Sequence, residues 1–150
     1  MKVSIHFITS LLLVIVLWPF IGPYSLWAIV GGYLIDVDHY LYTIFRLKTF
    51  SIKRSYQYHA TKEHHQKNKP GQILHLFHTI EFWIFMILMS IIAYKKNWNF
   101  IFYMFSITFL GMILHLSLDI THGIRNKIIK RRAISFMAWF IKFGKSRKAY

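Results

Sequence analysis

The chain has 150 residues, of which 55% are hydrophobic and 19% aromatic, and its formal net charge is +14 at pH 7. This apolar content exceeds that of an ordinary soluble domain of the same length, so the composition favours a membrane protein, and the basic residues are interpreted first as a guide to topology. Because the chain contains no cysteine, disulfides and thiolate metal ligands are excluded, and any metal site must use nitrogen and oxygen donors.

Four apolar stretches predict an all-α, polytopic membrane protein that forms a single membrane domain over residues 1–150. The stretches cover about residues 5–21, 24–45, 73–94 and 98–120. Each is close to the ~20 residues that a helix needs to cross ~30 Å of hydrocarbon, where backbone groups must be satisfied within the helix. The first stretch is followed by no small-residue cleavage site, so it is interpreted as a retained anchor rather than a signal peptide.

Lysine and arginine are distributed unevenly between the two sides that these spans would define. Seventeen of them fall before the first span, in the loop 46–72 or in the tail 121–150, and only two fall in the short hairpin after the third span. The positive-inside rule therefore predicts that both termini lie in the cytoplasm. We expect a multi-pass protein of the cell (inner) membrane.

The tail combines apolar residues at helical spacing with many basic residues. The apolar positions are Ile128, Ile129, Ala133, Phe136, Met137, Phe140 and Ile141. This pattern predicts a basic amphipathic helix that lies on an anionic membrane surface, and packing of the same helix on the protein itself stays open as an alternative. Membrane lipids are thus the expected partners, whereas nucleic acid is not expected because the basic segments lack the fold signatures of a nucleic-acid module.

Only five residues of the chain are acidic, and four of them fall within or at the end of an apolar stretch. These four are Asp36, Asp38, Glu81 and Asp119. Histidines accompany them in the sequence: His39, His75, His78, His115 and His122. With the predicted topology, all of these groups lie near the cytoplasmic ends of their helices, so one common depth is available to them.

Spacing within the helices brings several of these groups onto shared faces. His115, Asp119 and His122 are related as i, i+4 and i+7, and Asp36 and His39 as i and i+3. Asp38 does not share the face of Asp36 and His39 unless the helix ends or kinks there.

Carboxylates and imidazoles in a low-dielectric bundle are costly unless they are paired or bind a cation. The predicted metal ligands are Asp36, His39, His75, His78, His115, Asp119 and His122, with Asp38 and Glu81 as candidate catalytic groups that act as ligand or general base. This donor set suits Zn²⁺, with Mn²⁺ or Fe²⁺ as alternatives. Taken singly, His39, His75 and His122 fit a hydrogen-bonded helix contact better than a metal ligand, and only the three groups together favour a metal site; His6 is interpreted as structural.

Two segments resemble motifs of the YdjM-like inner-membrane proteins, a family described as membrane-bound metal-dependent hydrolases and distantly similar to zinc-dependent phospholipase C and the P1-type nucleases. "GGYLIDVDHY" is similar to the family's Gly-rich, Pro-Asp-x-Asp-His segment with Ile35 in place of proline, and "GMILHLSLDITHG" is similar to its His-x3-Asp segment. The middle motif departs: "LHLFHTIEF" aligns His78-Thr79 with a family His-Ser but lacks the Arg-Gly before it. The resemblance implies a metal-dependent hydrolase.

We therefore expect a membrane-bound, metal-dependent hydrolase that acts on a phosphoester, such as a phospholipid, at the cytoplasmic membrane face. Two alternatives stay open. The same clusters suit a metal or proton transporter, and they also suit a non-enzymatic membrane protein in which the polar groups hold helices together.

Overall fold

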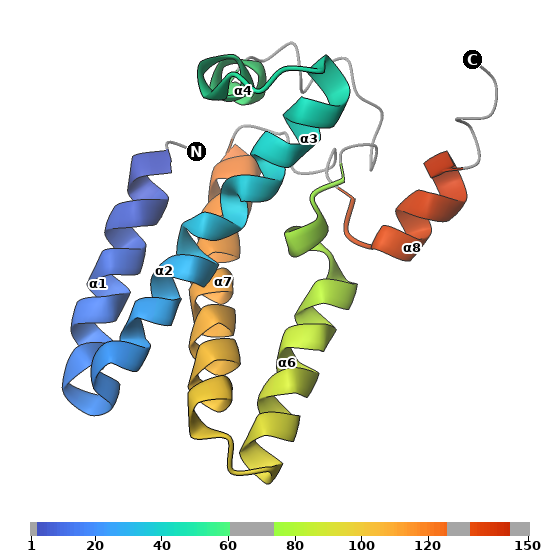
Figure 1. Cartoon of the computed structure of the whole chain (residues 1–150). Helices are drawn as coiled ribbons and strands as arrows, with labels where there is room; N and C mark the ends of the chain where they lie inside the picture. The colour runs from blue at the N-terminus through green and yellow to red at the C-terminus, as the bar shows by residue number, and fades with distance from the viewer. Residues whose placement is uncertain (1–2, 61–73, 126–132, 145–150) are drawn as a thin grey trace. The chain divides into compact units, whose positions relative to one another are not determined.

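The structure is a computed structural model that describes residues 3–60, 74–125 and 133–144, and every regular element in those ranges is helical (Figure 1). The predicted all-α class is thereby confirmed. By its internal contacts the chain divides into two compact units, one formed by Met1–Ile35 and Trp83–Arg125 and the other by Asp36–Phe82 and Asn126–Tyr150. Parts of the predicted cytoplasmic loop (61–72) and basic tail (126–132 and 145–150) lie outside the described residues.

The first unit begins with a helical hairpin. Helix α1 (Val3–Ile21) passes through the 3₁₀ turn η1 (Gly22–Leu26) into the short helix α2 (Trp27–Gly32). Gly22 takes φ = 55°, a left-handed conformation that glycine adopts without steric cost, and Pro23 starts the 3₁₀ turn, where its missing N–H removes no bond. The Gly-Pro pair thus forms the tight turn that its sequence predicts.

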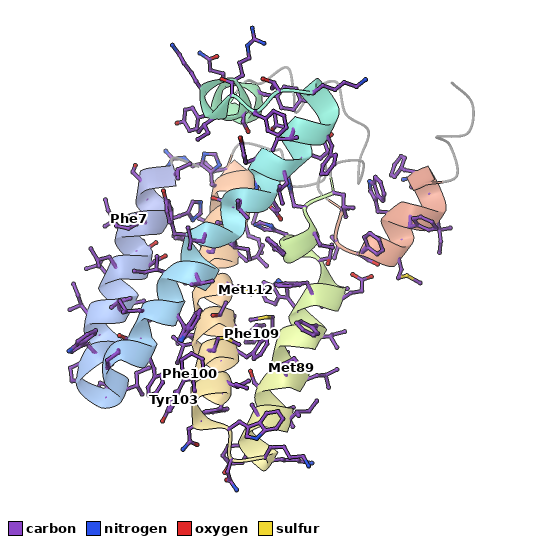
Figure 2. The ribbon with its side chains drawn as sticks, in the orientation of Figure 1. Phe7, Met89, Phe100, Tyr103, Phe109 and Met112 are labelled. Carbon is purple, nitrogen blue, oxygen red and sulfur yellow. The ribbon has the colours of Figure 1, made fainter. Side chains whose placement is uncertain are left out.

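A second hairpin joins α6 (Ile80–Lys95) to α7 (Asn99–Arg125). Asn97 closes it with φ = 56°, a left-handed conformation that asparagine tolerates better than most residues. Within the first unit the two helices are held by aromatic contacts: Trp83 packs edge-on against Phe109 at 5.4 Å between ring centroids. Figure 2 shows Phe109 with Met112, which is 1% exposed, on α7.

Helices α2 and α7 approach so closely that glycine is required on both. A Cβ at Gly31 would lie 1.8 Å from the backbone oxygen of Thr108, and one at Gly111 would lie 2.5 Å from that of Ala28. Neither backbone oxygen can move aside as a flexible side chain would. The missing side chains of Gly31 and Gly111 therefore permit the close packing of α2 and α7.

Among the described residues, two helical stretches, rather than the four predicted, are long and apolar enough to cross a membrane: Val3–Phe45 and Asn99–Arg125. The first joins two predicted spans into one run of helical turns. The third predicted span falls short because α6 has only 16 residues, and residues 75–79 before it leave the α-helical conformation. Along α1 many large apolar side chains are exposed, including Val16 at 63% and Phe20 at 81%, as suits a lipid-facing surface.

The second unit contains shorter helices. Its elements are α3 (Val37–Leu47), α4 (Ile52–Ala60), the 3₁₀ turn η3 (Leu76–His78), α8 (Phe136–Trp139) and the π-helical turn η5 (Phe140–Gly144). The predicted loop thus contains helix α4, which is fastened to α3 by a hydrogen bond of 3.0 Å from Ser55 Oγ to Thr43 Oγ1, both buried. Of the amphipathic helix predicted in the tail, residues 126–132 lie outside the described part of the chain, residues 133–135 are not helical, and residues 136–144 form the short α8–η5 run.

Candidate metal centres

The helix that was predicted over residues 24–45 breaks just before its acids. Tyr33 ends α2 with φ = −129° and ψ = −51°, and a 3₁₀ turn, η2 (Leu34–Asp36), separates it from α3. The break places Asp38 and His39 in the first turn of a new helix. It supplies the kink without which Asp38 would point away from the neighbouring Asp36 and His39.

In the second unit, Asp38 lies at the middle of what we name the Asp38 cluster: Asp36, Asp38, His39, His75 and His78. One carboxylate oxygen of Asp38 is 2.8 Å from His39 Nδ1, and the other is 3.0 Å from His78 Nδ1. The second oxygen also accepts the Phe77 backbone N–H at 3.2 Å. One carboxylate therefore orients two imidazoles that are far apart in the sequence.

His75 completes the packing of the imidazoles. Its ring stacks on that of His39 with 3.8 Å between centroids and 9° between planes, and its Nδ1 lies 3.7 Å from Asp38. His75 has an extended backbone (φ = −117°, ψ = 108°), and η3 follows it directly. The turn of η3 brings His78 back beside His75, with 5.8 Å between their ring centroids.

The Asp38 cluster is partly open to solvent on the side of Asp36. The side chains of Asp38 and His78 are each 5% exposed, whereas those of His39 and Asp36 are 18% and 22% exposed. Asp36 lies 3.4 Å from His39 Nδ1. Ligand atoms of Asp38, His39 and His78 lie within 4.8 Å of one another, close enough to share one metal ion.

In the first unit, a second group of candidate ligands is buried. We name it the Asp119 cluster: His6 of α1 with His115 and Asp119 of α7, which are 2%, 1% and 8% exposed. The two carboxylate oxygens of Asp119 lie 3.3 Å from His6 Nε2 and 3.6 Å from His115 Nε2, and the imidazoles stack at 4.0 Å. Here too the ligand atoms lie within 4.8 Å of one another.

The orientation of His115 favours a cation in this cluster. Its Nδ1 lies 3.0 Å from the backbone oxygen of Gly32, which can only accept a hydrogen bond, so Nδ1 carries a proton. In a neutral imidazole the lone pair of Nε2 would then face a carboxylate oxygen of Asp119. Two facing acceptors repel each other when buried, and a cation between them would remove this repulsion. A ligating histidine typically donates its other N–H in this manner.

Sequence reasoning missed His6 as a member of the cluster because it was considered alone. The available signal was its depth: His6 lies in the first turn of α1, as near to the cytoplasmic end of its predicted span as the other histidines are to theirs. His6 Nδ1 is buried without a hydrogen-bond partner among the described residues. A purely structural histidine in an apolar helix would more commonly have both nitrogens satisfied.

Glu81 and His122 belong to neither named cluster. His122 is half-buried on α7, three residues after Asp119. Glu81 instead accepts hydrogen bonds from the start of α8: Ser135 Oγ at 2.5 Å and the backbone N–H groups of Phe136 and Met137 at 3.0 and 3.1 Å. These bonds, that from Ser135 foremost, lower the pKa of Glu81 to about 2.

Comparisons of the chain with family profiles, with curated proteins and with solved structures found no match.

Proposed function

We propose that the chain is a membrane-bound, metal-dependent hydrolase of phosphoesters, with its reactive ion in the Asp38 cluster and a second, structural ion in the Asp119 cluster. The observation that carries this proposal is the difference in enclosure between the two groups of converging ligands. Catalytic metal sites keep a position open for water or substrate, whereas structural sites are closed. The half-open Asp38 cluster fits the first description, and the enclosed Asp119 cluster fits the second.

In the Asp38 cluster, His39 and His78 would hold the ion together with Asp38, and His75 would support the His39 ring from its stacked position. A bound divalent ion would lower the pKa of a water molecule to about 7 and polarise a phosphoryl oxygen. Among the residues of this cluster with a stated side-chain exposure, Asp36 has the highest, 22%, and can exchange a proton with solvent, so we assign it the role of general base. Asp38 orients two ligands, which makes it more important for binding the ion than for moving protons.

The preference for a phosphoester rests on charge and on the resemblance to membrane-bound hydrolases. Nineteen basic residues against five acidic ones attract anionic substrates, and a site near a membrane surface suits a phospholipid head group. The positive-inside distribution supports a site on the cytoplasmic face of the inner membrane, with both termini on that side. Zn²⁺ is the preferred ion because all donors are imidazole or carboxylate.

The proposal is tested by measuring metal content and phosphodiesterase activity of the detergent-purified protein side by side. Wild type should contain about two equivalents of metal. His78→Ala should lose one equivalent of metal together with the phosphodiesterase activity. His115→Ala should lose the other equivalent of metal, and those molecules of this variant that remain folded should keep the activity. His122→Ala, a half-buried histidine outside both clusters, is the matched control and should retain both. Wild type without metal after reconstitution, or hydrolysis unchanged in His78→Ala, would overturn it.

A further inference from the structure

The run α8–η5 in the second unit carries an apolar face that no described residue covers. The exposed fractions are 79% for Ile134, 60% for Met137, 53% for Phe140 and 68% for Ile141. Met137, Phe140 and Ile141 are related as i, i+3 and i+4, so they lie on one side of the run. The aromatic side chains of Phe136, Trp139 and Phe143 are half-buried. The exposed side of the run is therefore apolar, whereas the three aromatic side chains on its other side are partly covered by protein.

Hydrogen bonds to the first residues of α6 fix the start of the run that carries this face. The Glu81 carboxylate accepts hydrogen bonds from the Ser135 hydroxyl and from the backbone N–H groups of Phe136 and Met137. In addition, the Ile80 N–H donates a hydrogen bond to the Ile134 backbone oxygen at 2.9 Å. Ser135 Oγ in turn accepts the Ala138 N–H at 3.1 Å. Four hydrogen bonds, one each at Ile134, Ser135, Phe136 and Met137, thus fix the start of the run to Ile80 and Glu81 of α6.

The charge of the segment around this face has one sign. From Arg125 to Tyr150 the sequence contains nine lysines and arginines and no acid. Lys142 is exposed next to Ile141, and its Nζ lies 5.2 Å from the Phe143 ring centroid. The acid that contacts the run, Glu81, uses both of its oxygens on the start of α8, where the helix dipole favours a negative charge.

We propose that Ile134, Met137, Phe140 and Ile141 form a docking surface for an anionic lipid bilayer, with Lys142 binding a lipid phosphate and Glu81 fixing the orientation of the run. An exposed apolar face with Lys142 beside it, in a segment whose charged residues are all basic, matches the boundary between acyl chains and anionic head groups. A protein partner with an apolar groove would need acidic residues around that groove and would bind equally well in detergent. The lipid surface matches both features at once.

The absence of cysteine allows a direct test with the full-length protein. A single cysteine introduced as Met137→Cys is labelled with an environment-sensitive fluorophore, and the protein is reconstituted into nanodiscs of phosphatidylcholine or of an equal mixture of phosphatidylcholine and phosphatidylglycerol. We expect an apolar fluorophore environment, with quenching by lipids that carry a quencher on the acyl chain, in the anionic discs. Raising the salt concentration should reverse the change. Ile141→Cys is the second label position should the first variant fail to fold.

Reversing the charge of one residue tests whether docking depends on attraction between Lys142 and the anionic head groups. Lys142→Glu should shift the docking equilibrium about fivefold for each unit of charge, judged from the attraction of one basic residue to an anionic surface. Lys95→Glu, at the exposed end of α6, is the matched control and should leave the label unchanged. A label that stays in water in both kinds of disc would overturn the proposal. An apolar label that acyl-chain quenchers do not reach would also overturn it, because protein would then cover the face.

Discussion

Adding one methyl group at Gly31 should disturb both the packing of the first unit and its candidate metal centre. In Gly31→Ala the new Cβ would lie 1.8 Å from the Thr108 backbone oxygen, so α2 and α7 must separate by about 1.5 Å to reach a normal C···O distance of ~3.3 Å. The hydrogen bond from His115 Nδ1 to the Gly32 oxygen joins the same two helices and measures 3.0 Å. A separation of that size removes the bond.

The expected cost is about 3 kcal/mol of stability, the upper end for overpacking, because backbone rather than a side chain obstructs the methyl group. Loss of the Gly32 contact should also lower the metal affinity of the Asp119 cluster by about 10- to 100-fold, as for other groups that orient a ligating histidine. Thermal unfolding in detergent measures the first effect. Competition with a chromophoric chelator measures the second, in a His78→Ala background so that the Asp119 cluster alone is observed.

Gly22→Ala provides the control for this prediction. Gly22 also adopts a conformation that suits glycine, φ = 55°, but a Cβ there meets no atom within 4 Å. The substitution should cost about 1 kcal/mol from backbone strain and leave metal affinity at the wild-type value. If Gly31→Ala behaves like Gly22→Ala in both assays, the close helix crossing does not position His115 and the reasoning fails.

Three further predictions concern the tail and the turns. Glu81→Gln, which keeps the shape of the side chain but removes its charge, should increase the mobility of a spin label at residue 137. Ser90→Ala, which removes a hydroxyl that donates to the Met86 oxygen within α6, is the control and should not. Equal mobility in both variants would contradict the contact between Glu81 and the start of α8. Because the pKa of Glu81 is lowered from 4.5 to about 2, the stabilisation is present above pH 4.5 and is lost as the pH falls toward 2; the same label should therefore keep its mobility from neutral pH to about pH 4, and release near neutral pH would refute this. Asn97→Gly should be nearly neutral and Asn97→Ala should cost about 1 kcal/mol in thermal unfolding, since φ is 56°; equal melting temperatures would show that the turn relaxes.

Features that depend on composition and local turn chemistry could be predicted from the sequence. The apolar runs predict the all-helical class. Gly22 and Pro23 favour a tight turn, and the missing side chain of Gly31 permits the close approach of another helix. The number of spans could not be predicted in this manner. Helical periodicity does not reveal the break at Tyr33 or the extended backbone at His75. The segment that follows His75 is held by a tertiary contact, the hydrogen bond from the Phe77 N–H to Asp38, which no local pattern reports.

The candidate site was predicted in part. Asp38, His39 and His78 converge as ligands in one unit and His115 and Asp119 in the other, all of them named from the sequence as site residues. His6 was missed because nothing in its own sequence neighbourhood points to Asp119, more than a hundred residues away. Glu81 was assigned to the chemistry because it follows two histidines. Its interaction with Ser135 joins positions 54 residues apart, which no spacing rule reaches.

The hydrogen bond between His78 and Asp38 also has a consequence for chain topology. It fastens two points that lie 40 residues apart in a protein without cysteine. Closing a loop of that length costs about 3 kcal/mol of chain entropy, which the unfolded protein does not bear. An ion shared by Asp38 and the two imidazoles would bind only the closed loop, so the stability of the second unit would rise with metal concentration. The cluster would then act as a reversible cross-link at a place where a secreted protein uses a disulfide.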